Sequence, residues 1–315
     1  MSTTNAPPDP PSWRRPLRYF NRMPLLPSHR KELSLTTSRG NLYLITQFKE
    51  RLPMPVRNRA IAMLSEFVGT FFFMFVGLAG NSVVVSDAAV AIQFAGGDLR
   101  ANPAKLLFTA MVWGLSVIVN AWAFFRISGG LFNPAVTMAM MFIRAVPPVD
   151  GLCDMVAQLV ASVLASGVCY ALLPEGALAA TELGSQTSVT QGVFIEAILT
   201  ARLVIAVFML AAEKHKATYI APVGIGLCVF ACTLTGAAYT GASLNPARSF
   251  AVNVVNGQFQ GYHWIYWVGP ALGALLATGF YLLIRKLEYW TIDSGADSYQ
   301  SKIGEELIAL QQKKD

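Results

Sequence analysis

Two short segments of this chain carry the same tripeptide, Asn-Pro-Ala, at corresponding points of apolar runs. They are Asn133-Pro134-Ala135 and Asn245-Pro246-Ala247. An asparagine oxygen can accept a backbone N–H at the start of a helix, and proline fits the first helical position because no donor is needed there. Each tripeptide therefore predicts the beginning of a helix, with the asparagine as its cap.

The helices that follow these tripeptides are expected to be short. The apolar runs at 133–143 and 246–255 are too short to cross a membrane, so we expect re-entrant half-helices. A third copy of the tripeptide, at residues 102–104, precedes a full-length apolar run and is interpreted as an ordinary helix start.

The chemistry that this pair of motifs predicts is the exclusion of charge. If the half-helices enter from opposite faces, their N-termini meet near the midplane, each with a partial charge of about +0.5. With its oxygen in the cap, each of Asn133 and Asn245 is expected to present its NH₂ group as a donor into a lumen. Cations and hydronium would meet a positive barrier while neutral molecules pass, which predicts a passive pore.

The composition places these motifs in a membrane. Charged residues make up 13% of the chain, against about a quarter in soluble domains. Residues 1–59 hold 14 of the 42 charged residues and residues 285–315 hold 11, which leaves 17 for the 225 residues between. This excludes a soluble enzyme, a disordered protein and a small secreted scaffold. Because 11 of the 24 basic residues precede the first apolar run, we interpret them as a topology signal, and expect no nucleic-acid partner.

Six apolar runs are long enough to span a bilayer. They lie at about 61–84, 105–125, 152–173, 191–211, 218–237 and 264–284. Most Lys and Arg residues fall in the segments that six spans place on one side, so both termini are expected to be cytoplasmic. Residues 1–59 are expected to form a largely disordered tail, residues 60–286 the membrane domain, and residues 287–315 a second tail.

The membrane domain repeats itself. The first and fourth spans each contain one carboxylate, Glu66 and Glu196, and residues 128–135 (SGGLFNPA) match residues 240–247 (TGASLNPA). Three spans per half is an odd number, so the repeats, at about 60–173 and 188–286, must be inverted relative to each other. The expected fold class is therefore an all-α membrane protein with six transmembrane helices and two half-helices.

These features resemble the aquaporin (major intrinsic protein) family, and the segment GYHWIYWVGP resembles its fungal water channels. The resemblance covers about residues 60–288 and includes SGGLFNPAVTM and TGASLNPARSF. It implies a right-handed six-helix bundle that assembles as a homotetramer in a cellular membrane, expected to be the plasma membrane. It also implies that Glu66 and Glu196 bind loop backbone around the two half-helices.

The resemblance further implies a selectivity filter of four residues, namely Trp113, Thr233, Ala242 and Arg248. Water-selective members usually have His at the position of Thr233, and many have Cys at that of Ala242. Trp113 is typical of glycerol-conducting members, whereas Ser249, after the filter arginine, is typical of water channels. We therefore expect a water pore that excludes ions and protons, with a widened filter that also admits hydrogen peroxide or glycerol.

Other functions remain as alternatives. One is a polyol channel, and another is a secondary transporter that couples ions through Glu66 and Glu196. A structural junction protein is a weaker candidate. An enzyme is disfavoured because the sequence contains no Ser-His-Asp set, metal cluster or phosphate loop, and no cofactor or metal is expected. Cys228 and Cys232 lie at helical spacing without His or carboxylates nearby, so we expect them to pack in the helix bundle.

Four further positions carry narrower hypotheses. Tyr19 or Tyr43 of the N-terminal segment could plug the cytoplasmic mouth, and Ser128 is a candidate phosphorylation site in the same vestibule. Leu131 replaces a His frequent in the family, which predicts an apolar vestibule. Arg202, in the fourth span, has no assigned role.

Overall fold

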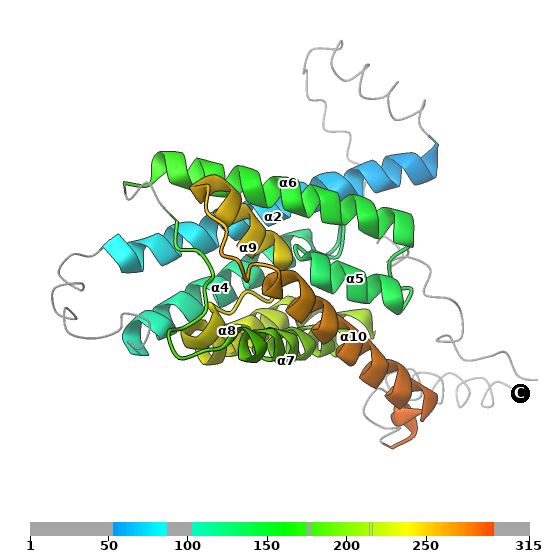
Figure 1. Ribbon diagram of the computed structural model, residues 1–315. Coiled ribbons are helices and arrows are strands. Elements are labelled where there is room, and N and C mark those ends of the chain that lie inside the picture. The colour runs from blue at the N-terminus through cyan, green and yellow to red at the C-terminus, as the bar shows by residue number, and fades with distance from the viewer. Residues whose placement is uncertain (1–52, 87–102, 175–177, 214, 216, 293–315) are drawn as a thin grey trace, which may run out of the picture.

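The computed structural model describes residues 53–86, 103–174, 178–213, 215 and 217–292, and their regular structure is helical (Figure 1). The long helices are α2 (Met54–Ser86), α4 (Pro103–Phe124), α6 (Pro148–Leu172), α7 (Val189–Val207), α8 (Ala221–Thr240) and α10 (Ile265–Lys286). The short helices are α5 (Pro134–Phe142) and α9 (Pro246–Asn256). A π-helical turn, η3 (Phe208–Ala212), continues α7, and two 3₁₀ turns, η4 (Thr218–Ile220) and η5 (Tyr289–Thr291), precede α8 and follow α10.

The six long helices are each long and apolar enough to cross a membrane. They coincide with the six predicted spans, and α5 and α9 coincide with the two predicted half-helices. The first helix begins at Met54, six residues before the boundary expected for the membrane domain. The fold class expected from the sequence is thus confirmed.

The polarity of the bundle is the reverse of that in a soluble protein. On α2, Leu64, Phe72 and Val76 are exposed, whereas Glu66 and Thr70 are fully buried. Apolar side chains can face lipid without cost, while a carboxylate in the membrane needs partners inside the protein. The outer surface therefore matches the bilayer, and the polar groups that matter for function lie inside.

Exposed aromatic side chains mark both ends of the bundle. Tyr170 and Tyr239 lie near the ends of α6 and α8, and Trp264 precedes α10. Trp122 and Tyr219 lie near the end of α4 and the start of α8. Tyrosine and tryptophan prefer the membrane–water interface, so the two groups fit the two borders of a bilayer.

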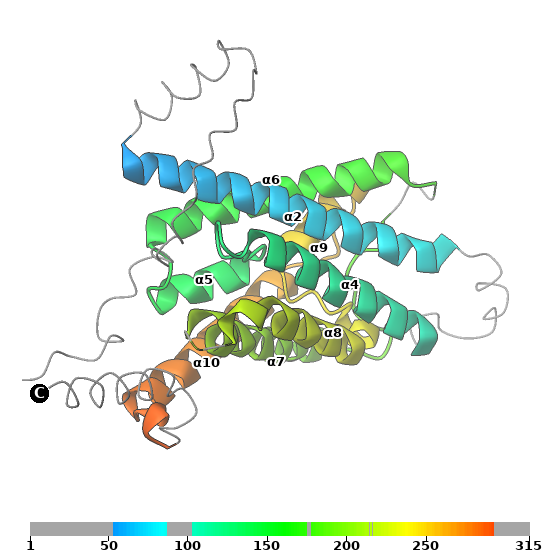
Figure 2. The ribbon, with the colours of Figure 1, turned by 180° about the vertical axis from the view of Figure 1, so that it is seen from behind.

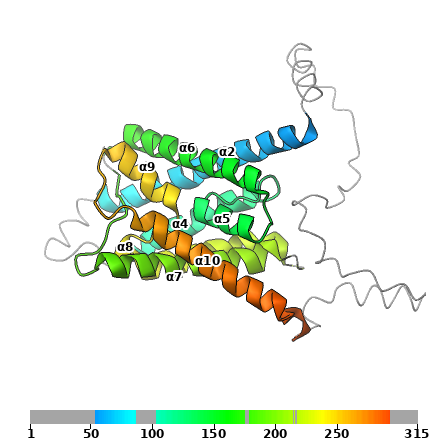
Figure 3. The same cartoon turned by 45° about the vertical axis from the view of Figure 1, so that its right-hand side comes forward.

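The helices form two groups that enclose α5 and α9. In the first group α2 packs against α4 and α6, in the second α7 packs against α8 and α10, and α4 and α8 join the groups. The short helix α5 lies against α6 and α10, while α9 lies against α6 (Figures 1 and 2). A third view shows α5 and α9 approaching the interior from opposite ends of the bundle (Figure 3). This is the arrangement that inverted repeats require.

Candidate functional site

The two asparagines cap the two short helices as the sequence predicts. Asn133 Oδ1 accepts the N–H of Ala135 at 2.9 Å, and Asn245 Oδ1 accepts the N–H of Ala247 at 3.0 Å. Each short helix then begins at its proline. The third Asn-Pro-Ala copy lies at the start of the 22-residue helix α4, which begins at Pro103, although Asn102 itself lies outside the described residues.

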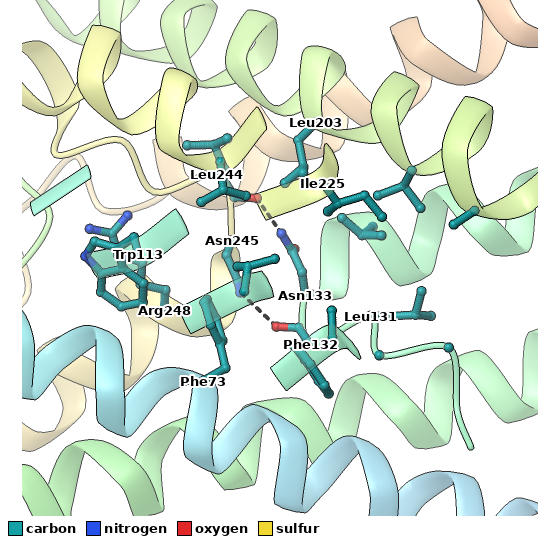
Figure 4. A pocket seen from close by; sticks show the side chains of 18 of the residues that line it. Phe73, Trp113, Leu131, Phe132, Asn133, Leu203, Ile225, Leu244, Asn245 and Arg248 are labelled. Carbon is teal, nitrogen blue, oxygen red and sulfur yellow. Dashed lines mark hydrogen bonds between the residues drawn. The ribbon is translucent and has the colours of Figure 1, made fainter. Parts of the chain in front are cut away.

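The asparagine amides also join the two halves of the chain. Asn133 Nδ2 donates to the carbonyl of Leu244 at 2.8 Å, and Asn245 Nδ2 donates to the carbonyl of Phe132 at 2.9 Å (Figure 4). The expectation that each NH₂ group donates into the lumen can therefore apply to only one of its two N–H bonds. One N–H of each amide is bound to the opposite half, which leaves one N–H of each for the cavity.

The acceptor carbonyls reach this position through an uncommon backbone conformation. Phe132 and Leu244 have φ angles of 50° and 53°, in the left-handed region that bulky residues rarely occupy. These residues directly precede the two asparagines, so the same turn occurs in both repeats. The conformation is held by contacts to two buried carboxylates.

The first of these carboxylates is Glu66 of α2, which is fully buried. It accepts hydrogen bonds from Ser128 Oγ at 2.6 Å, from the N–H of Leu131 at 3.0 Å and from the N–H of Phe132 at 2.9 Å. Gln158 Nε2 donates a fourth at 2.8 Å. Glu66 therefore fixes the loop that leads into α5, which is the contact that the family resemblance implies.

The second carboxylate, Glu196 of α7, makes the equivalent contacts in the other half. It accepts hydrogen bonds from Thr240 Oγ1 at 2.6 Å and from the N–H groups of Ser243 and Leu244, each at 2.8 Å. Tyr266 Oη donates to the carbonyl of Thr240 at 2.9 Å and so braces the same loop from α10. The correspondence follows from the repeat, because Ser128, Leu131 and Phe132 align with Thr240, Ser243 and Leu244.

Ser128 thus has a structural contact where the sequence suggested a phosphorylation site. Its hydroxyl donates to Glu66, accepts from Ser65 Oγ at 3.0 Å and accepts from the N–H of Gly130 at 3.2 Å. A phosphate here would break the contact to Glu66 and add negative charge beside a buried carboxylate, so these contacts favour a bracing role. Tyr19 and Tyr43, the other candidates for gating, lie outside the described residues.

Gln158 and Thr137 are contacts that the sequence did not single out. Gln158 Nε2 bridges Glu66 and Thr137 Oγ1, at 2.8 and 2.9 Å, and Thr137 Oγ1 donates to the carbonyl of Asn133 at 3.0 Å. Both side chains are fully buried within the membrane domain. An amide in the middle of an apolar span is the signal that could have identified Gln158.

A chain of hydroxyl groups supports the second asparagine in a different way. Thr181 Oγ1 donates to Ser249 Oγ at 2.6 Å, Ser249 Oγ lies 2.5 Å from Ser243 Oγ, and Ser243 Oγ donates to the carbonyl of Asn245 at 2.9 Å. Ser249 is therefore a structural link between α9 and the segment before α7. The serine side chain suits this buried position because it is small and uncharged.

One cavity connects the four expected filter residues with the two asparagines of the Asn-Pro-Ala motifs; Pro134, Ala135, Pro246 and Ala247 do not line it. Figure 4 shows Trp113 and Arg248 at one end, Asn133 and Asn245 in the middle, and Leu131 beyond them. Thr233 and Ala242 also line this cavity. The wall on the Leu131 side is apolar, as the sequence predicts. It includes Phe125, Val136, Met140, Leu203, Val207, Ala211 and Ile225.

The Trp113 end of the cavity combines a fixed cation with an aromatic ring. The guanidinium carbon of Arg248 lies 4.1 Å from the centre of the Trp113 ring, which favours a cation–π contact. Arg248 Nη1 also donates to the carbonyl of Ala242. Within the described residues, Trp113 Nε1 and Thr233 Oγ1 are buried without a hydrogen-bond partner. Two polar atoms are thus available here to a molecule in the cavity.

Comparison with known proteins identifies the family. The model of the family described as "Major intrinsic protein" matches residues 56–281. The chain belongs to the major intrinsic protein family, the aquaporins. It is therefore a multi-pass membrane protein with the fold of this channel family.

Fungal aquaporins are among its relatives. The chain is 50% identical over 249 residues to Aquaporin-7 of Botryotinia fuckeliana, covering 79% of this chain and 54% of that protein. It is 46% identical over 239 residues to Probable aquaporin-3 of Gibberella zeae, covering 76% and 82%. The aligned part spans about half the length of the first curated relatives that it matches. The solved structure of the aquaglyceroporin from Plasmodium falciparum matches with a TM-score of 0.54 at 21% identity, over 70% of this chain and 95% of that one, which supports the fold alone.

The cysteines of this aquaporin lie away from the cavity. Cys228 Sγ donates to the carbonyl of Arg202 and Cys232 Sγ to that of Leu199, each at 3.7 Å, so both thiols pack against α7 as expected. None of Cys153, Cys169, Cys228 and Cys232 lines the cavity. The side chain of Arg202 is exposed on the outer face of α7, and nothing in the structure explains a charge there.

Replacing Ala242 with cysteine is expected to make the channel sensitive to mercurials. Ala242 lines the cavity next to Arg248, so a mercury adduct at this position would obstruct it. We expect A242C to lose most of its water permeability on treatment with HgCl₂ and to recover with a thiol reductant. The wild-type protein is the control and should respond little. A strong mercury block of the wild type, or none in A242C, would contradict this placement of Ala242.

Outside the membrane-spanning helices, His263 packs at the turn before α10. Its Nδ1 lies 3.2 Å from Asn253 Nδ2, its Nε2 accepts from Trp267 Nε1 at 3.4 Å, and its ring meets Phe259 edge-on at 4.9 Å. Partial burial lowers the pKa of His263 below its ordinary 6.5, because the charged form is poorly solvated there. The folded aquaporin therefore favours neutral His263.

This shift predicts a small loss of stability in acid. A histidine whose pKa is lowered by folding contributes its full stability above the unfolded pKa of 6.5, and that stability falls as the pH drops toward the folded value. We expect the thermal unfolding temperature in detergent to decrease below pH 6.5. His263→Gln, which keeps hydrogen-bonding groups but cannot titrate, should decrease less. An identical decrease in both proteins would contradict the assignment to His263.

Proposed function

We propose that this aquaporin conducts water passively and also admits small hydroxylated solutes, namely glycerol and hydrogen peroxide, while excluding ions and protons. The observation that carries the proposal is the single cavity that runs from Trp113 and Arg248, past Asn133 and Asn245, to an apolar wall. In the described part of the chain, Arg248 is the one charged residue that lines it, which suits neutral solutes rather than coupled ions.

The exclusion of ions is supported by three positive features on one path. The N-termini of α5 and α9 meet at the cavity, where the asparagine amides contact the opposite half. Each helix N-terminus carries a partial positive charge, and Arg248 adds a full one. A cation would lose its hydration shell beside these positive groups, whereas water can offer its oxygen to the donors.

The wider solute range is supported by the Trp113 end. Trp113 Nε1 and Thr233 Oγ1 are buried groups without partners among the described residues, and unsatisfied buried donors favour a ligand that can hydrogen-bond to them. A solute hydroxyl can accept from the indole N–H while its carbon skeleton lies against the ring. Ala242 and Thr233 have short side chains, which leaves room for a solute larger than water.

Permeability measurements on proteoliposomes test this proposal. The purified protein should raise water, hydrogen peroxide and glycerol permeability above that of empty vesicles, with no proton or sodium current. Exclusion of glycerol and peroxide would restrict the function to water, and the wide-filter argument would then be wrong. Glycerol conduction without water conduction would favour a polyol channel. Transport that requires an ion gradient would favour a secondary transporter, with Glu66 and Glu196 as coupling groups.

We further propose a homotetramer with both termini cytoplasmic, expected in the plasma membrane. The apolar outer faces of the helices support burial in lipid or against further copies, and the distribution of Lys and Arg supports the orientation. Light scattering of the detergent-solubilised protein should give the mass of four chains. Protease treatment of sealed cells should leave both tails intact. A monomeric mass, or cleavage of either tail from outside, would overturn the corresponding part.

A further inference from the structure

The position of Trp113 is set by packing rather than by a polar anchor. Its side chain is 2% exposed, and its Nε1 makes no hydrogen bond within the described residues. The edge of the ring meets Phe73 at a centroid distance of 5.4 Å, and Arg248 covers it at 4.1 Å. Whatever supports the ring from α2 therefore determines how far it reaches toward Arg248.

That support is Gly77, where the ring occupies the place of a side chain. A β-carbon built on Gly77 would lie 2.4 Å from Cζ3, 2.6 Å from Cε3 and 2.7 Å from Cη2 of Trp113. Non-bonded carbon atoms essentially never come this close. The three atoms belong to one rigid ring, so they cannot move out of the way one by one. An alanine at position 77 would therefore have to displace the indole as a whole.

We propose that Gly77 is a specificity-determining positioning residue, which sets the width of the opening between Trp113 and Arg248. To reach an ordinary contact of 3.4 Å, the ring atom nearest to Gly77 would move by about 1 Å, an overpacking displacement that a packed interior resists. The indole is held between α2 and Arg248, so this movement narrows the space that a solute crosses. This inference rests on the proposed passage of solutes between Trp113 and Arg248.

The same helix supplies a matched control. Gly80 also lies on α2 against α4, and a β-carbon there would meet Val112 Cγ1 at 2.5 Å. Val112 does not line the cavity. Gly80→Ala therefore disturbs the same pair of helices without touching Trp113. A second control is Gly279→Ala on α10, where the added β-carbon meets nothing within 4 Å; it shows the effect of the helix-forming tendency of alanine alone.

The test compares Gly77→Ala, Gly80→Ala and the wild type in proteoliposomes, with water, hydrogen peroxide and glycerol as probes. The measured quantity is the ratio of solute permeability to water permeability, for the largest solute that the wild type conducts. Gly77→Ala should lower this ratio by about tenfold, which corresponds to a barrier higher by about 1.4 kcal/mol. Gly80→Ala should leave that ratio unchanged. An unchanged ratio in Gly77→Ala, or the same change in Gly80→Ala, would overturn the inference.

Two additional readouts separate this inference from folding and from the proposed solute range. Trp113→Leu removes the three ring atoms that the alanine would meet, so adding it to Gly77→Ala should restore folding. If Gly77→Ala fails to fold and Trp113→Leu does not rescue it, the inference is wrong. If the wild type conducts water alone, the proposed solute range has failed. Gly77 is then judged by water permeability, which should fall in Gly77→Ala and persist in Gly80→Ala.

Discussion

Glu196→Ala is expected to prevent the second half of the channel from folding. The fully buried carboxylate accepts hydrogen bonds from Thr240 Oγ1 and from the N–H groups of Ser243 and Leu244. Without it, three buried donors lose their acceptor, at a cost of about 1–3 kcal/mol each. Because the net stability of a folded domain is only about 5–15 kcal/mol, the loss is large enough to unfold the protein.

The measurement is the yield of monodisperse protein after solubilisation, followed by thermal unfolding. Glu196→Gln retains one acceptor oxygen, so it should be intermediate. Glu66→Ala removes the equivalent acceptor in the first half and should behave like Glu196→Ala. Glu182→Ala is the control, because Glu182 accepts from Gln260 Nε2 at 3.2 Å in a partly exposed loop. Normal folding of Glu196→Ala would show that the carboxylate does not hold the loop before α9.

Arg248→Ala is expected to change what the channel selects more than how fast it conducts water. The variant loses the one positive side chain that the described residues place on the cavity wall, and the contact that holds the Trp113 ring at 4.1 Å. The opening widens and the barrier to cations weakens. We expect glycerol permeability to rise by about tenfold, as for a barrier lowered by about 1.4 kcal/mol, together with a measurable proton leak.

Arg248→Lys separates the charge from the geometry. Lysine keeps the positive charge but lacks the planar group that covers Trp113 and donates to the Ala242 carbonyl. This variant should still exclude protons while its solute range changes. Flux measured with glycerol and with a pH-sensitive dye inside the vesicles distinguishes the two effects. If Arg248→Ala conducts the same solutes as the wild type and no protons, Arg248 does not control passage.

Several features of the fold depend on short stretches of sequence and could be predicted from them. A span is predicted by the length of an apolar run, and the half-helices by runs too short to cross the membrane. The helix starts at Pro134 and Pro246 follow from local chemistry, because an asparagine cap acts within two residues. The repeat then required inversion, since each half contains an odd number of spans.

The candidate site itself could be predicted only in outline. The sequence singled out Glu66 and Glu196, because a carboxylate in an apolar span is costly and needs a partner. It assigned Ser128 to regulation, since nothing local shows that its hydroxyl contacts Glu66, 62 residues away. Gln158 was missed because its partners, Glu66 and Thr137, lie 92 and 21 residues away.

Only the tertiary structure decided how the two halves meet. Asn133 and Asn245 donate to carbonyls 111 and 113 residues distant, and those carbonyls are presented by left-handed turns at Phe132 and Leu244. The support of Trp113 by Gly77 likewise joins α2 to α4. Sequence by itself determined the membrane domain, its inverted repeat and the two capped half-helices, because apolar length and helix capping are local. The shape of the cavity depends on contacts between distant segments, which exist only once the helices have packed.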